Sequence, residues 1–332
     1  METMKGQLKD SITKIFNSFK NDSIVTVKFN KNDIVQQLET ADALGTFSET
    51  INLLVGQTSE IYKQYKVLGI SHNSTYEDIN LEKVKSFHFK GSNITCGISI
   101  GNEYIVLGDE AEKKLHLLKK DANIINSTVF NGNPKRLCYD YCYSRVFISC
   151  HAQELYRATC LLFRNEIMKP EKMDFVKESV GALFHHNENI FLLVNNAVKQ
   201  FPKSLEGELT TSFATNTTCE LNGNSILEDT IIFTTKDKEI KRATLNGREI
   251  FCYKNETIKN PECLAILPSG LVLFVDRHNR GLLHGLSPDG KNHRILLQNF
   301  EKIENPMDIW LDADKETVYI AGGEYIEVYE LT

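Results

Sequence analysis

The sequence predicts an all-β fold, a six-bladed β-propeller, for three reasons. A pattern of short apolar runs separated by polar turns recurs six times between residue 83 and the C-terminus. The second run of each repeat starts 40 to 47 residues after the previous one, and a four-stranded propeller blade takes about 40–50 residues. The runs are rich in aromatic and β-branched residues, which favour strands, and the turns carry Gly, Asn and Asp.

The second runs give the clearest measure of the repeat. They begin at Ile105, Val146, Ile190, Ile231, Leu271 and Val318. A chain of 332 residues would ordinarily suggest more than one domain, but all-β propellers and barrels often exceed that expectation as a single unit. We therefore assign residues 83–332 to one propeller and residues 1–82 to a separate preceding segment.

The two ends of the repeat region predict how the ring closes. The last repeat supplies only three runs, at residues 307–312, 318–320 and 325–331. A three-stranded blade would leave an open sheet edge, which folded proteins avoid. Residues 84–90, just before the first repeat, alternate between apolar and polar side chains. We predict that this segment is the outer strand of the sixth blade.

The segment before the propeller has a different pattern. An apolar stripe at helical spacing predicts an amphipathic helix, with Leu8, Ile12, Ile15, Phe16 and Phe19 on one face. Such a helix cannot bury its stripe alone, so residues 1–20 are expected to be a coiled-coil tail that forms a homodimer or docks on the propeller. Residues 23–29 alternate like an edge strand, residues 32–39 resemble a short Asn-capped helix, and residues 44–80 are mostly polar linker.

Composition and charge narrow the classes of function. The formal net charge of −6 gives no overall attraction to nucleic-acid phosphates. The N-terminus lacks a secretory signal and no stretch approaches the length of a membrane span. The expected location is therefore the cytoplasm, without membrane contact.

The eight cysteines are expected to be buried, reduced thiols, because none belongs to a C-x-x-C pair and several lie in apolar runs. A metal site from Cys138, Cys142, Cys150 and His151 is the alternative, but strand alternation would scatter these side chains. No phosphate loop, H-E-x-x-H or G-x-S-x-G motif is present. The sequence thus predicts no cofactor, no bound metal and no catalytic residue.

Several segments carry a family resemblance. They are residues 266–276 (ILPSGLVLFVD), 286–290 (LSPDG), 304–312 (ENPMDIWLD) and 326–331 (IEVYEL). These segments resemble the NHL-repeat propeller at the C-terminus of tripartite-motif (TRIM) proteins. Residues 25–30 and 38–45 look like the junction that follows the coiled coil in that family. The RING and B-box zinc modules of the family have no counterpart here, so the resemblance implies partner binding and assigns no ubiquitin-ligase activity.

A binding surface can be placed from the repeat alone. In a propeller, the loops that lead into the innermost strands and the turns between second and third strands lie on one face around the axis, which is the default binding surface. We predict that the partner-binding face contains Lys135, Arg136, His151, Glu220, Lys236, Lys238, Glu262, Arg277, His278, Arg280 and Asp308.

Three functions compete for this face. The first is a non-enzymatic scaffold that captures a protein or peptide partner, where mixed charge sets orientation and association rate. The second is single-stranded RNA binding, which needs a basic groove with aromatic stacking platforms. A basic patch is available from Lys236, Lys238, Arg277, His278 and Arg280, but acidic groups interrupt it and no aromatic residue is interleaved.

The third function is a calcium-dependent, lactonase-like hydrolase. Some six-bladed propellers hold calcium at the axis, and calcium needs converging oxygen ligands. Glu220, Glu262 and Asp308 start successive repeats and are placed to converge, with Asn260 nearby. Of the three functions, the scaffold is the one we expect.

Overall fold

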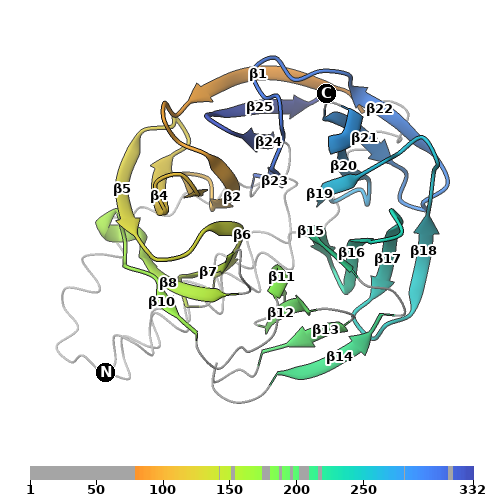
Figure 1. The fold of residues 1–332 in the computed structure, drawn as a ribbon, viewed down its shortest axis with the longest axis horizontal. Coiled ribbons are helices and arrows are strands. Elements are labelled where there is room, and N and C mark those ends of the chain that lie inside the picture. The colour runs from red at the N-terminus through yellow and green to blue at the C-terminus, as the bar shows by residue number, and fades with distance from the viewer. Residues whose placement is uncertain are drawn as a thin grey trace, which may run out of the picture. The chain divides into compact units, whose positions relative to one another are not determined.

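The computed structural model of this protein shows six antiparallel sheets arranged around a central axis (Figure 1). It describes residues 79–332 apart from residues 142, 151–153, 174–179, 187–188, 195–196, 202–208, 216–218, 280 and 313–316. The helix, edge strand, short helix and most of the linker expected before the propeller lie outside the described residues. Within the described part, no helix has the length and apolar character needed to cross a membrane.

The first three blades follow one another along the chain, each running from its inner to its outer strand. Blade 1 contains β2 (Ile94–Ile100), β3 (Tyr104–Asp109), β4 (Lys114–Lys119) and β5 (Ile124–Val129). Blade 2 contains β6 (Pro134–Asp140), β7 (Arg145–Cys150), β8 (Leu155–Leu161), β9 (Glu166–Ile167) and β10 (Glu171–Lys172). Blade 3 contains β11 (Val180–His186), β12 (Asn189–Val194), β13 (Ala197–Gln200) and β14 (Thr210–Ala214).

The other three blades complete the ring. Blade 4 contains β15 (Cys219–Leu227), β16 (Thr230–Thr235), β17 (Ile240–Thr244) and β18 (Glu249–Tyr253). Blade 5 contains β19 (Pro261–Ile266), β20 (Val272–Asp276), β21 (Leu282–Leu286) and β22 (His293–Leu297), with the short 3₁₀ turn η3 (Arg277–Asn279) after β20. Blade 6 contains β23 (Asp308–Leu311), β24 (Thr317–Gly322), β25 (Tyr325–Leu331) and, on its outside, β1 (Leu81–His88).

The outer strand of blade 2 is irregular. Two short strands, β9 and β10, pair with different parts of β8, and the 3₁₀ turn η2 (Leu162–Arg164) precedes them. Pro170 lies between the two strands. Because proline has no backbone N–H to donate to a ladder, one continuous outer strand is not favoured there.

The predicted ring closure is confirmed. β1 pairs antiparallel with β25 from Leu81 opposite Leu331 to His88 opposite Tyr325, with one bulge. The backbones of Asn80 and Thr332 extend the ladder with hydrogen bonds of 2.8 and 3.0 Å. Figure 1 shows the orange β1 lying along the dark blue β25. The chain therefore joins its first and last described strands in one sheet, and no open three-stranded blade remains.

The core lies between the blades. Among the described residues, six clusters of buried apolar side chains occur, one at each contact between neighbouring blades. Cys138 and Cys150 are both buried, but they belong to clusters on opposite faces of blade 2, as alternation along strands predicts. The described cysteines form no disulfide. Burial raises the pKa of Cys263 to about 12, so this thiol stays protonated at neutral pH.

Blades 1 and 5 each have an aspartate at the end of the second strand that stabilises the neighbouring loops. At the end of β3, Asp109 Oδ1 accepts hydrogen bonds from the backbone amides of Asn93 and Ala111 at 3.0 and 2.9 Å. At the end of β20, Asp276 accepts from the amides of Lys259 and Asn260 at 3.1 and 2.9 Å. Each aspartate thus ties the loop leading into the inner strand to the following turn, which fixes the shape of that face.

Candidate functional site

The six inner strands form a closed ring around the axis. β2, β6, β11, β15, β19 and β23 each contact the next, and β23 contacts β2 (Figure 1). The loops leading into these strands and the turns joining second to third strands open on one side, which we call the upper face. The turns joining first to second and third to fourth strands form the lower face.

A buried ion pair crosses the axis below the upper face. Arg136 Nη1 on β6 donates to Asp308 Oδ1 on β23 at 2.9 Å and to the Met307 carbonyl at 3.1 Å. The other oxygen of Asp308 accepts from the Gly97 amide of β2 at 3.1 Å. Burial lowers the pKa of Arg136, but Asp308, together with smaller effects of Cys263 and Cys96, outweighs it and raises the pKa, so the guanidinium stays charged. One ion pair therefore links blades 2, 1 and 6.

A second hydrogen-bond network lies on blade 5, around Glu262 and Arg277. Arg277 Nη1 donates to Glu262 Oε2 at 2.7 Å, and Asn260 Nδ2 donates to Glu262 Oε1 at 2.7 Å. Arg277 also donates to Asn305 Oδ1 on the loop leading into blade 6, at 2.9 Å from Nη2. Arg277 therefore bridges two blades, and its side chain is engaged with protein partners.

The two axial carboxylates described by the structure are already satisfied. Both oxygens of Glu262 and both oxygens of Asp308 accept hydrogen bonds, and each carboxylate has one arginine partner. Calcium needs several free oxygen ligands that converge on one point. In this arrangement each carboxylate faces an arginine, so the convergence expected for a calcium site is not formed by these two residues.

The predicted site residues fall into three groups. Three of them, Arg136, Glu262 and Asp308, are buried beneath the surface of the upper face. Lys236, Lys238 and His278 are exposed on its surface, and Lys135 and Arg277 are half-buried. His151 and Arg280 lie outside the described residues, and Glu220 falls in β15 where its side chain is not described. The structure thus brings Arg136 together with Asp308 and Arg277 together with Glu262.

Charges of both signs alternate on the upper face. The β16–β17 turn exposes Lys236, Asp237 and Lys238. The described exposed tyrosines, Tyr141 and Tyr143, lie instead on the β6–β7 turn of the lower face. A stacking surface for bases is therefore not found beside the lysines among the described residues.

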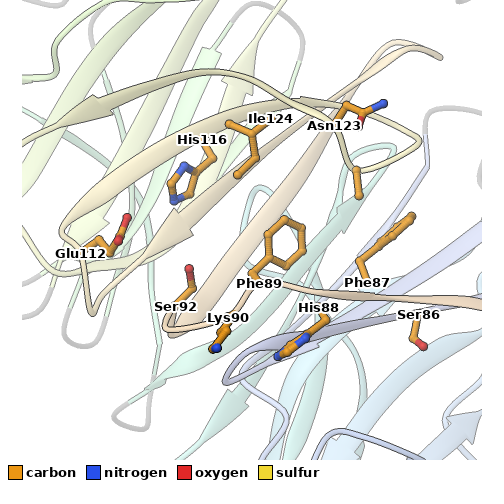
Figure 2. A pocket seen from close by; sticks show the side chains of 11 residues that line it. Ser86, Phe87, His88, Phe89, Lys90, Ser92, Glu112, His116, Asn123 and Ile124 are labelled. Carbon is orange, nitrogen blue, oxygen red and sulfur yellow. The ribbon is translucent and has the colours of Figure 1, made fainter.

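An open groove of roughly 670 Å³ lies between blades 6 and 1. Its walls come from β1 and the loop after it on one side and from β4, β5 and their turns on the other. Figure 2 shows Phe89, Ser92, Glu112 and His116 gathered around this groove. The sequence did not single out His116, because an isolated histidine in an apolar strand carries no motif.

The histidine equivalent to His116 in blade 5 is His284, and it makes stability depend on pH. His284 is buried, stacks on Phe274 with ring centroids 4.8 Å apart, and neither ring nitrogen has a hydrogen-bond partner in the described structure. Burial, with a smaller effect of His293, lowers the pKa of His284 to about 4. Between this value and about 6.5 the unfolded chain binds more protons, so the free energy of unfolding falls as the pH drops through that window.

We expect the contribution of His284 to reach about 3 kcal/mol across the window. Replacing His284→Phe should remove it, which urea denaturation at pH 7 and at pH 4.5 would measure as a smaller difference than in the wild type. His278→Phe, at an exposed position of the same blade, is the control. An unchanged pH dependence in the His284→Phe variant would contradict this assignment.

Comparison with known proteins supports the fold. No protein-family model and no curated protein matches the sequence. The WD40 β-propeller domain of Doa1 is similar in structure with a TM-score of 0.55 and 9% identity, covering 76% of this chain and 97% of that one. A Bacteroides thetaiotaomicron VPI-5482 protein of unknown function has a TM-score of 0.59 and 12% identity, covering 76% of each chain. At these identities the similarity establishes the β-propeller fold alone.

Proposed function

We propose that this protein is a non-enzymatic scaffold that captures a protein or peptide partner on the upper face of its propeller. The observation that carries the proposal is a difference between the buried and the exposed charged side chains of this face. The buried charges at the axis are paired with each other and hold the blades together. The exposed charges around them have mixed sign and lie on short turns, where they are available for orienting a partner.

The alternatives have less support from the described residues. For calcium-dependent hydrolysis, the axial carboxylates would have to give up their arginine partners. For RNA, Arg277 is engaged by Glu262 and Asn305, and Arg280 lies outside the described residues. The exposed basic residues Lys236 and Lys238 flank Asp237, and no described exposed aromatic ring lies beside them or His278. A protein surface with complementary charges fits this arrangement better than a uniformly negative nucleic-acid backbone.

The finer assignment is to an NHL-type propeller of the tripartite-motif family, acting in the cytoplasm. It is supported by Asp276, which ends the second strand of blade 5 within residues 266–276, one of the segments that resemble that family. In this proposal residues 1–20 form a homodimer or dock on the propeller. A sedimentation measurement on the full chain, with Ile12→Asp as the variant, would test dimerisation.

Charge reversal on opposite faces of the propeller tests the scaffold function. Lys236→Glu with Lys238→Glu alters the upper face of blade 4, and Arg248→Glu with Lys291→Glu alters exposed positions on the lower face of blades 4 and 5. Partners recovered from nuclease-treated lysate by the full chain should bind the upper-face variant at least about tenfold more weakly, a loss of about 1.4 kcal/mol. The lower-face variant, which carries the same change in charge, should bind them as the wild type does.

Two results would reject the proposal. Loss of all partners after nuclease treatment would favour the RNA function. Loss of binding only in the lower-face variant would place the interaction on the wrong side of the propeller. Titration of a purified partner, followed by fluorescence anisotropy, would give the ratio of dissociation constants directly.

A further inference from the structure

Two buried polar atoms face each other beside the groove between blades 6 and 1. His116 Nε2 on β4 lies 3.5 Å from Asp109 Oδ2 at the end of β3. Asp109 is fully buried and His116 is 5% exposed. At this distance their contact is at most a weak hydrogen bond, and neither atom has a partner of normal hydrogen-bond geometry within the described residues. A buried polar atom without a partner is unfavourable and requires an explanation.

The other polar atoms of both side chains are already used. His116 Nδ1 lies 2.7 Å from Ser127 Oγ on the neighbouring strand β5. Asp109 Oδ1 accepts the backbone amides that shape the turn. These contacts fix the orientation of both side chains and leave His116 Nε2 and Asp109 Oδ2 directed at each other.

A third ligand group lies within reach. Glu112, on the β3–β4 turn, has a carboxylate oxygen within 4.8 Å of the other two ligand atoms. It is exposed, lines the groove, and pairs with Lys114 Nζ at 2.7 Å. A surface ion pair of this kind contributes little to stability, so the carboxylate can turn toward a stronger partner at small cost.

We propose that Asp109, Glu112 and His116 form a binding site for a divalent transition-metal ion of the zinc type, open to the groove. Zinc binds imidazole nitrogen and carboxylate oxygen at about 2.0–2.2 Å in tetrahedral geometry, which places neighbouring ligand atoms about 3.4 Å apart. The 3.5 Å between His116 Nε2 and Asp109 Oδ2 matches that spacing. The fourth position faces the groove and is left for water or a side chain of a bound partner.

The contact of the second ring nitrogen fits this role. Ser127 Oγ, 2.7 Å from His116 Nδ1, is placed to accept a hydrogen bond from Nδ1–H. A histidine that binds metal through one ring nitrogen usually donates a hydrogen bond from the other, which fixes the tautomer and leaves Nε2 for the ion.

Blade 5 provides an internal comparison. Asp276 and His284 occupy the positions of Asp109 and His116 in the strand pairing, but the third residue after the aspartate is Asn279 in blade 5 and Glu112 in blade 1. The ring of His284 stacks on Phe274 with centroids 4.8 Å apart, and the tilted ring of His293 lies 5.7 Å away. Only the blade 1 residues form a group of three potential ligands within the described structure. A variant at His284 is therefore a matched control for one at His116.

Metal titration of the full chain tests the site. After treatment with a chelator, Zn²⁺ is added in competition with a chromophoric chelator, and Co²⁺ is added separately to record its visible spectrum. We expect one Zn²⁺ per chain and a tetrahedral Co²⁺ spectrum without a thiolate charge-transfer band. His116→Gln should abolish this binding and His284→Gln should leave it intact. Glu112→Gln, which removes one of the three proposed ligands, should weaken it by at least about tenfold.

Because Glu112 is exposed, the Glu112→Gln variant is expected to fold, and it tests the site even if the His116→Gln variant does not fold. Equal Zn²⁺ affinity in the wild type and the Glu112→Gln variant would overturn the proposal, as would binding of no stoichiometric Zn²⁺ by the wild type. A cobalt–thiolate band would assign the metal to cysteines such as the exposed Cys252 and would also overturn it. Because the readout is metal affinity, the result is independent of partner capture on the upper face.

Discussion

Replacing Arg136→Leu is expected to lower the free energy of unfolding by about 3–5 kcal/mol, the range observed when one member of a buried ion pair is removed. Arg136 is 7% exposed and Asp308 is 6% exposed. Without the guanidinium, Asp308 would keep backbone amide partners, such as that of Gly97, but would lose its arginine partner. Urea denaturation followed by fluorescence of Trp310 would measure the change.

The double variant Arg136→Leu, Asp308→Leu removes the ion pair without leaving Asp308 buried and unpaired. It therefore distinguishes the two costs. It should recover part of the stability, because a buried carboxylate is no longer left without an arginine. Arg277→Leu is the matched comparison, since Arg277 also pairs with a carboxylate but is half-buried. A wild-type unfolding midpoint for Arg136→Leu would show that the axial pair does not hold the blades together.

Replacing Trp310→Ala is expected to lower the free energy of unfolding by about 3–5 kcal/mol, as for other large buried aromatic side chains. Trp310 stacks on Tyr319 with ring centroids 5.3 Å apart and fills the contact between blades 6 and 1. Its indole edge also covers Gly97 of the inner strand of blade 1. Truncation would leave a cavity where the last blade joins the first, and thermal unfolding would detect it as a lower Tm.

Two further variants test whether lost packing between blades 6 and 1 causes the lower Tm. Trp310 Nε1 has no hydrogen-bond partner among the described residues, so Trp310→Phe loses only part of the buried surface and should be much less destabilising. Gly97→Ala approaches the same contact from the other side, where an added Cβ would lie 2.5 Å from the indole ring. If Gly97→Ala and Trp310→Ala both left the Tm unchanged, the blade 6–blade 1 contact would not limit stability.

The architecture was largely predictable because it depends on local patterns. Alternating apolar residues determine which strand faces bury against neighbouring blades, and a repeat near 40 residues determines the number of strands per blade. The three-run final repeat and the alternating segment at 84–90 were enough to predict closure by β1. The break in the outer strand of blade 2 at Pro170 was not expected, although a proline within a strand region is its visible sign.

The candidate site was only partly predictable. Glu262, Arg277 and Asp308 were placed on the upper face from the repeat, but the same reasoning treated the acidic residues as free ligands and the basic ones as a patch. Pairing Arg136 with Asp308 joins residues 172 positions apart, and no local pattern encodes which arginine reaches which carboxylate. The upper face as a partner-binding surface, and the cytoplasmic location, stay predictions.

By itself, the sequence determined that this protein is an all-β six-bladed propeller, because strand periodicity, turn residues and repeat length are all properties of neighbouring positions. Tertiary structure alone decided which polar side chains meet. Ring closure brings Arg136 to Asp308 across three blades, and the β3–β4 turn brings Asp109, Glu112 and His116 within 4.8 Å of one another. The Arg136–Asp308 contact depends on the path of the backbone through several blades, which packing of the whole ring sets. The cluster in blade 1 depends on the conformation of the β3–β4 turn, which the spacing of its residues does not define.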